Sequence, residues 1–108
     1  TSFELRMTSE AQSQIEQIMG DSSKLGLQKQ LKKSLGHLSS NPHHPGLNSH
    51  PMASFEAVYK VKVFSSYVQN NTPAAHRILW AYGEGLKEIV ILGVIEKFQK
   101  VVDLKKET

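Results

Sequence analysis

Hydrophobic residues in the first twenty positions change from strand-like to helix-like spacing. FELRM, Phe3 to Met7, is hydrophobic at every second position, which is typical of a β-strand. Ser9 and Gln12 have the spacing of a capping box, so we expect a helix to begin at Ser9. Gly20 should end this helix. Its hydrophobic face comprises Ala11, Ile15, Ile18 and Met19.

A second helix is predicted from Ser23 to Ser40. One stripe of this segment is rich in leucine, and lysines project from another side. The dipeptide Asn41-Pro42 should stop the helix, because proline disfavours a helical residue before it. The two predicted helices would form an αα-hairpin. The stripe comprises Leu27, Leu31, Leu35 and Leu38, and the lysines are Lys29, Lys32 and Lys33.

The second half of the chain has the pattern of a β-sheet. Residues 41–54 contain three prolines and a glycine and predict a loop, with a short extended piece near Leu47. VYKVKVF, residues 58–64, alternates and predicts a strand that runs on through SYVQ to a turn at NNTP. HRILWAY, residues 76–82, predicts a strand with His76, Ile78, Trp80 and Tyr82 on one face and Arg77, Leu79 and Ala81 on the other.

The last predicted strand is hydrophobic throughout. EIVILGVI, residues 88–95, has no polar face, so we expect it to be central in its sheet. Residues 97–108 form a tail with helical spacing. The order predicts an α+β fold in one domain, residues 1–108, with a small antiparallel β-sheet and the αα-hairpin packed on one face.

Composition narrows the possible functions. The 108 residues include no cysteine, which excludes disulfides and thiolate metal sites. No hydrophobic run has the ~18 residues of a membrane span, so we expect a cytoplasmic protein without a membrane partner. The net charge is +3, and residues 24–62 carry six lysines against Glu56. This basic segment is either an attractive surface for phosphates or an acidic partner, or a solvated lysine face.

Several motifs together resemble the RelE/ParE superfamily of bacterial toxins. They are an opening strand followed by TSEA, a leucine-rich helix that runs into Asn41-Pro42, a Pro-Gly-Leu segment, and RILWAYG paired with EIVILGVI. The combination NPHHPGL…SYVQNNTP…RILWAYG is especially similar to a RelE-like subgroup. The resemblance covers roughly Phe3 to Phe98 and implies a β-α-α-β-β-β order.

The resemblance implies a toxin of a type II toxin–antitoxin system. RelE-like toxins are ribosome-dependent mRNA endonucleases, so the expected partners are mRNA on the ribosome and a cognate antitoxin protein. Arg77 occupies the position of the family's strand arginine, which holds the scissile phosphate. The alternative for Arg77 is a structural pair with Glu88 or another carboxylate. Lys97 is the basic residue that could act as the second catalytic group.

Lys60 and Lys62 can be placed in two ways relative to the strand that precedes the arginine strand. Lys60 and Lys62 either lie on the strand that precedes the arginine strand, where both could bind RNA, or precede a strand formed by SYVQN. We favour the second register, in which the lysines are at most binding residues. His44 is a further candidate for RNA contact, because histidine titrates near neutral pH.

Other chemistries find little support in the sequence. His43, His44 and His50 form a histidine-rich loop, but a site such as His44 with His50 would need a carboxylate as third ligand and the loop has none, so we expect no metal. The chain has no phosphate-binding glycine loop and no nucleophile–base pair, so we expect no small-molecule cofactor. Two alternatives to RNA cleavage stay open. One is a ParE-like gyrase inhibitor, and the other is a catalytically degenerate member that binds only RNA or an antitoxin.

Overall fold

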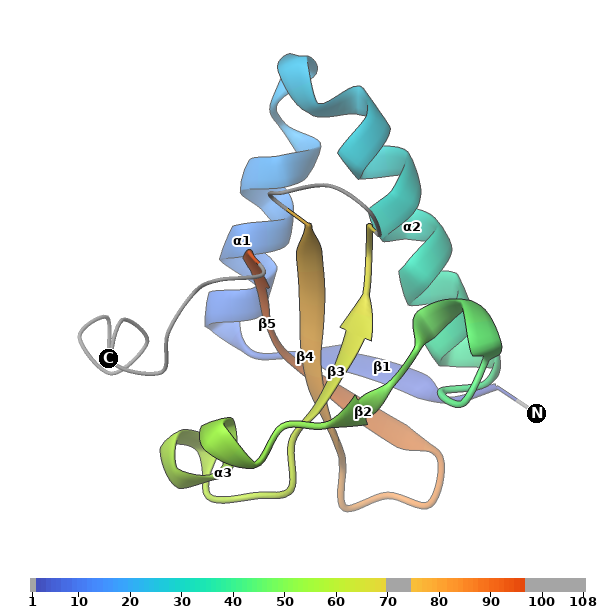
Figure 1. Cartoon of the computed structure of the whole chain (residues 1–108), viewed down its shortest axis with the longest axis vertical. Helices are drawn as coiled ribbons and strands as arrows, with labels where there is room; N and C mark the ends of the chain where they lie inside the picture. Colours follow the sequence, from blue (N-terminus) through green and yellow to red (C-terminus); the bar gives the residue numbers. More distant parts are fainter. Residues whose placement is uncertain (1, 70–74, 97–108) are drawn as a thin grey trace.

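A computed structural model describes residues 2–69 and 75–96 and shows an α+β fold (Figure 1). A helical hairpin tapers to one end of the molecule in this view, and a short helix lies at the other end. The helices are α1 (Ser9–Met19), α2 (Leu25–Ser40) and α3 (Ala53–Tyr59), with 3-10 turns η1 (Ser22–Lys24) and η2 (Pro45–Leu47). The strands are β1 (Glu4–Met7), β2 (His50–Pro51), β3 (Phe64–Tyr67), β4 (His76–Tyr82) and β5 (Glu88–Glu96).

The five strands form one mixed sheet in the order β1-β5-β4-β3-β2. β5 lies between β1 and β4, as its uninterrupted hydrophobic sequence predicts. β5 runs antiparallel to β4 but parallel to β1, so the prediction of a purely antiparallel sheet was wrong. A strand that is hydrophobic on both faces is expected in the middle of a sheet. Its sequence does not show whether the flanking strands run parallel or antiparallel to it.

A β-bulge in β5 changes which side chains face the helical hairpin. Leu79 pairs with Gly93 whereas Trp80 pairs with Ile91, so Leu92 is the extra residue. Gln14 on α1 satisfies the local backbone, because its Oε1 accepts the Val94 N–H at 2.7 Å.

Each face of the sheet has its own hydrophobic core. The hairpin side joins residues of α1 and α2 to the sheet and includes Ile18, Leu31, Leu38, Ile78, Trp80, Ile89, Ile91 and Val94. The opposite side is covered by α3 and includes Phe55, Val63, Leu79, Ala81, Leu92 and Ile95. The predicted packing of the αα-hairpin on one face is therefore confirmed, and so are the two faces of β4.

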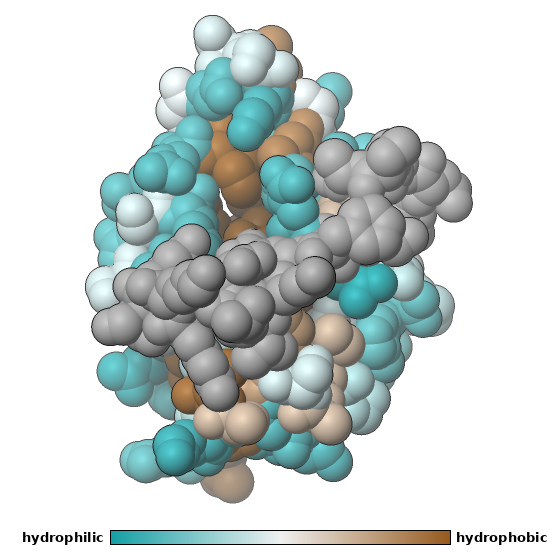
Figure 2. All heavy atoms as spheres, turned by 60° about the vertical axis from the view of Figure 1, so that its left-hand side comes forward, coloured by the Kyte–Doolittle hydropathy of each residue, from teal (hydrophilic) through white to brown (hydrophobic). Residues whose placement is uncertain are grey.

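The outer surface of the helical hairpin is mostly hydrophilic. Figure 2 shows the side of the molecule that carries α1, with hydrophilic residues over most of the upper, helical part and hydrophobic residues visible between them. Leu31 and Leu38 are fully buried, whereas Lys29, Lys32 and Lys33 are exposed. The leucine and lysine sides of the second helix are therefore as predicted.

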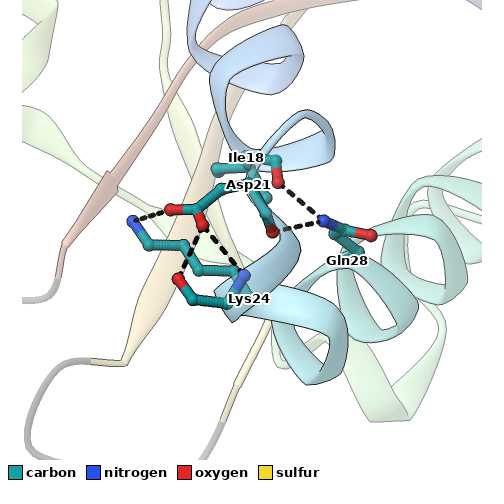
Figure 3. Close-up of polar contacts among 5 residues, drawn as sticks. Ile18, Asp21, Lys24 and Gln28 are labelled. Carbon is teal, nitrogen blue, oxygen red and sulfur yellow. Dashed lines mark hydrogen bonds and ion pairs between the residues drawn. The ribbon is translucent and has the colours of Figure 1, made fainter.

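Polar contacts close the turn between α1 and α2 (Figure 3). Gln28 Nε2 donates to the carbonyl oxygens of Ile18 at 3.0 Å and of Asp21 at 2.8 Å, which satisfies carbonyls at the end of α1. The Asp21 carboxylate accepts from the hydroxyl and the backbone N–H of Ser23. These two hydrogen bonds hold the pKa of Asp21 below its usual range.

α1 begins at Ser9 as predicted, but its capping residue differs from the prediction, and so does the start of the second helix. α1 is capped by Thr8 and not by Ser9, because the Thr8 hydroxyl accepts the Ala11 N–H at 3.1 Å. The same hydroxyl donates to the Leu92 carbonyl, which ties the cap to β5. The second helix begins with the 3-10 turn η1 and becomes α-helical only at Leu25.

The region between the hairpin and β3 contains the largest correction. Residues 58–63 are not a strand: α3 ends at Tyr59 and Lys60 adopts a left-handed conformation with φ 62°. Phe55 and Tyr59 lie one helical turn apart and pack in the core under α3, so a helical spacing overlaps the start of the alternating residues 58–63. The predicted extended piece is β2 at His50–Pro51, whereas Leu47 lies in η2. The predicted NNTP turn and the 97–108 tail lie outside the described residues.

Candidate functional site

Pairing between β3 and β4 places Tyr67 directly opposite Arg77. Both side chains lie on the face of the sheet that turns away from the hairpin, since their neighbours Ser65 and Leu79 alternate with residues of the hairpin-side core. Arg77 and Tyr67 are half-buried, and Ser65 and Leu79 are fully buried beside them. The pair therefore stands on rigid strands at the edge of a hydrophobic core.

An aromatic ring, not a carboxylate, holds Arg77 in place. The centre of its guanidinium lies 5.0 Å from the centroid of the Tyr67 ring, and Nη2 donates to the Tyr67 hydroxyl at 3.4 Å. Glu88, which the sequence offered as a partner, instead pairs with Arg6 at 3.3 Å, so the predicted pair with Glu88 was wrong. Nε of Arg77 is buried without a hydrogen-bond partner among the described residues. Its positive charge is thus fixed in place without an acidic partner there.

His50 joins this pair from the neighbouring strand. β2 places His50 opposite Ser65, and the imidazole meets the Tyr67 ring edge-on with a centroid separation of 6.2 Å. His50 Nδ1 lies 3.0 Å from the Asn48 carbonyl oxygen. A carbonyl can only accept, so we assign the proton of the neutral ring to Nδ1, which leaves the lone pair of Nε2 free.

Arg77, Tyr67 and His50 form a cluster whose groups have complementary chemistry. A guanidinium binds a phosphate through a planar fork of donors. A neutral imidazole can accept a proton, and a phenol whose oxygen already accepts a hydrogen bond can still donate its own proton. The Arg77 cluster therefore has the groups that phosphodiester cleavage by proton transfer requires.

The lysine pair does not join the Arg77 cluster. Lys60 is exposed at the end of α3. Lys62 precedes β3, and its Nζ lies 5.7 Å from the centroid of Phe64, which packs with Trp80 in the hairpin-side core. The Phe64–Trp80 pair is three residues along the sheet from Tyr67–Arg77, or about 10 Å, and on the opposite face. The strand follows the lysine pair, as the favoured register predicts.

His44, the other predicted RNA contact, lies on the hairpin side. Its ring stacks on His37 of α2 with centroids 3.8 Å apart, and its Nδ1 accepts the Gly46 N–H at 3.0 Å. His43 contacts the hydroxyl of Tyr82 at 3.3 Å. Lys97 lies outside the described residues, so its predicted catalytic role has no structural counterpart here.

Tyr67 and His50 are the members of the Arg77 cluster that sequence reasoning missed. The sequence predicts a strand at Tyr67 without indicating which face its side chain occupies, and it places His50 in a predicted loop. The register of β3 against β4 brings Tyr67 to Arg77, and the two-residue strand β2 brings His50 to Tyr67. A short strand leaves almost no periodic signal, so only the alternation of Tyr67 with Ser65 could have suggested the arrangement.

No protein-family model matches this chain, and a search of curated proteins found no significant relative. Within residues 2–69 and 75–96, no helix is long and hydrophobic enough to cross a membrane. The same residues contain no group of three histidine or acidic side chains that could hold a metal ion.

Proposed function

We propose that this chain is a RelE-like toxin of a type II toxin–antitoxin system that cleaves mRNA on the ribosome. The observation that carries the proposal is the Arg77 cluster, in which a guanidinium without an acidic partner among the described residues lies beside a phenol, and an imidazole contacts that phenol ring in turn. Its place on rigid strands means that little ordering is needed before a phosphate binds.

The chemistry we propose is attack by the ribose 2′-oxygen on the neighbouring phosphorus. His50 Nε2 takes the proton from the 2′-hydroxyl as the oxygen–phosphorus bond forms. Arg77 donates to the phosphate oxygens, where negative charge increases in the transition state. The Tyr67 hydroxyl, oriented by Arg77 Nη2, donates its proton to the 5′-oxygen as that oxygen leaves. The products are a 2′,3′-cyclic phosphate and a free 5′-hydroxyl.

The arrangement of elements also supports the proposal. The chain runs from an opening strand through a helical hairpin to the strands that carry Arg77, as the sequence resemblance implies. β2 and α3 are additions to that order.

The proposed partners are mRNA on the ribosome and an antitoxin protein, both in the cytoplasm. Residues 24–62 carry six lysines against Glu56 and would attract RNA or an acidic antitoxin segment. Lys60 and Lys62 are proposed as part of this attraction and not of the catalytic step.

Cell-free translation with purified protein tests the proposal, with cuts mapped by primer extension. Arg77→Ala and Arg77→Lys should both abolish the cuts, because lysine keeps the charge but not the fork of donors. Tyr67→Phe and His50→Gln should each slow cleavage by roughly 10²–10⁴-fold, the usual contribution of a general acid or base. Arg6→Ala is the matched control, since Arg6 is the other arginine and lies exposed beside Glu88.

The possible results separate the candidate functions. Cuts that persist in Arg77→Ala would remove the Arg77 cluster from the mechanism. Intact mRNA with the wild-type protein would exclude the ribosome-dependent nuclease. Inhibition of gyrase supercoiling would then favour a ParE-like toxin, and its absence would favour a member that only binds RNA or an antitoxin.

A further inference from the structure

A pocket of about 400 Å³ lies between α2 and the segment that leads into β2. Residues at positions 30, 33, 34 and 37 share one side of α2 because three- and four-residue spacings coincide on a helix. His44 and Gly46 face them, and Tyr67 and Val68 complete the lining. The α2 residues of the pocket are Gln30, Lys33, Ser34 and His37.

The lining of this α2 pocket offers donors and no carboxylate. Lys33 brings an ammonium group and Gln30 an amide. The Ser34 hydroxyl already donates to the Tyr67 carbonyl at 3.1 Å, so it holds α2 against β3 at the side of the pocket. A ligand of this pocket would therefore gain most from carrying negative charge.

Two stacked histidines, His37 and His44, also favour a negatively charged ligand in this pocket. The Gly46 N–H donates to His44 Nδ1, so the neutral His44 ring carries its proton on Nε2 and is a donor without being charged. Burial lowers the pKa of His37, and the neighbouring His44 and Lys33 lower it further. Lys33, His44 and Tyr67 are the other titratable groups that line the pocket. An anion bound between Lys33, His37 and His44 would offset the repulsion that disfavours a positive charge on His37.

We propose that the α2 pocket binds a phosphate group of an RNA strand. Tyr67 borders both sites: its backbone carbonyl accepts from Ser34 at the pocket, and its side chain lies beside Arg77 on the opposite face of the sheet. An RNA strand whose scissile phosphate lies at Arg77 has to pass around the edge of the sheet at Tyr67, beyond the end of β2, to bring another phosphate to Lys33 and His44. The assignment of RNA as the source of this phosphate rests on the proposed function, whereas the affinity of the pocket for an anion does not.

RNA binding without ribosomes tests the pocket separately from cleavage. The probe is a fluorescent oligoribonucleotide with 2′-deoxy substitutions, which lacks the attacking oxygen, and the readout is anisotropy at several salt concentrations. Lys33→Gln should weaken binding about fivefold or more and reduce the salt slope by about 0.7, the value for one phosphate contact on a single strand. Lys29→Gln is the matched control, because Lys29 is an exposed lysine of the same helix outside this pocket.

Sulfate binding tests the anion site itself. Sulfate keeps two negative charges between about pH 8 and about pH 5.5, whereas histidine titrates in this range. Bound sulfate should raise the pKa of His37, so its affinity should increase as the pH falls, and NMR should show the imidazole signals of His37 and His44 shifting together. His37→Gln should remove most of this pH dependence, because it removes the group that takes up the proton.

Each outcome decides between the two proposals. Equal RNA binding by Lys33→Gln and Lys29→Gln, or sulfate that leaves the histidine signals unchanged, would overturn the pocket even if Arg77-dependent cleavage persists. Binding that depends on Lys33 in a protein that never cuts mRNA would support the pocket and reject the nuclease. A mononucleotide that binds more tightly than the oligonucleotide would overturn the RNA strand as the source of the phosphate.

Discussion

Replacing Ser66 with alanine should destabilise the protein, because Ser66 is the middle of a buried hydrogen-bond chain. Trp80 Nε1 donates to Ser66 Oγ at 2.8 Å, the two hydroxyls of Ser66 and Ser49 lie 2.6 Å apart, and Ser49 Oγ donates to the Pro42 carbonyl at 2.9 Å. The indole can only donate and the carbonyl can only accept, so Ser66 accepts from Trp80 and donates to Ser49.

The size of the effect follows from what Ser66→Ala leaves unpaired. Trp80 is fully buried, and an indole N–H without a partner there costs about 1–3 kcal/mol. Loss of the bond to Ser49 adds about 1 kcal/mol, since a typical intramolecular hydrogen bond contributes that much. We therefore expect Ser66→Ala to lower the free energy of unfolding by about 2–4 kcal/mol, or the melting temperature by roughly 10–20 °C.

Ser65, the adjacent serine, provides a control because its replacement by alanine should not lower the free energy of unfolding. Ser65 is equally buried, but its hydroxyl has no partner among the described residues. Removing an unpaired buried hydroxyl should be neutral or stabilising. Urea denaturation followed by the fluorescence of Trp80, the single tryptophan, gives both midpoints.

A double-mutant cycle then isolates the indole bond. In a Trp80→Phe background the indole N–H is absent, so Ser66→Ala should cost at least about 1 kcal/mol less than in the wild type, as circular dichroism can measure. Equal destabilisation by Ser65→Ala and Ser66→Ala, or a coupling energy near zero, would refute the reasoning. The cycle also bears on the α2 pocket, because Ser49 and Pro42 belong to the segment that carries His44.

The remaining predictions concern packing, capping and pH. Leu31→Ala should cost about 2–5 kcal/mol in urea denaturation because Leu31 is fully buried, whereas Leu25→Ala, at a residue 66% exposed, should change stability by less than about 0.5 kcal/mol. Thr8→Ala should cost about 0.5–2 kcal/mol through loss of the cap of α1, and Ser9→Ala should cost clearly less; equal effects would restore Ser9 as the cap. The pKa of His37 is lowered from 6.5 in the folded protein, so the unfolded chain binds more protons and stability should fall as the pH drops below about 6.5. His37→Gln should flatten this part of the pH profile of the urea midpoint, and an unchanged profile would assign the loss to another group.

The sequence alone determined the helices and strands whose hydrophobic periodicity extends over many residues. The hairpin helices, the two faces of β4 and the central place of β5 follow from side-chain spacing, because burial of one face is a local property of a helix or strand. The Gly20 end of α1 is likewise local, since it depends on backbone preference at a single residue.

Tertiary structure decided what depends on partners distant in the chain. The parallel pairing of β1 with β5 and the bulge at Leu92 are properties of two strands at once. The strand-like alternation of residues 58–63 overlaps a helix-like spacing between Phe55 and Tyr59, and packing of these two side chains against the sheet selected α3. The Arg77 cluster has the same origin, because the sequence identifies only an arginine inside a hydrophobic strand. The register of β3 and β4 gives Arg77 its neighbour Tyr67, β2 adds His50 beside Tyr67, and Glu88 pairs with Arg6 instead.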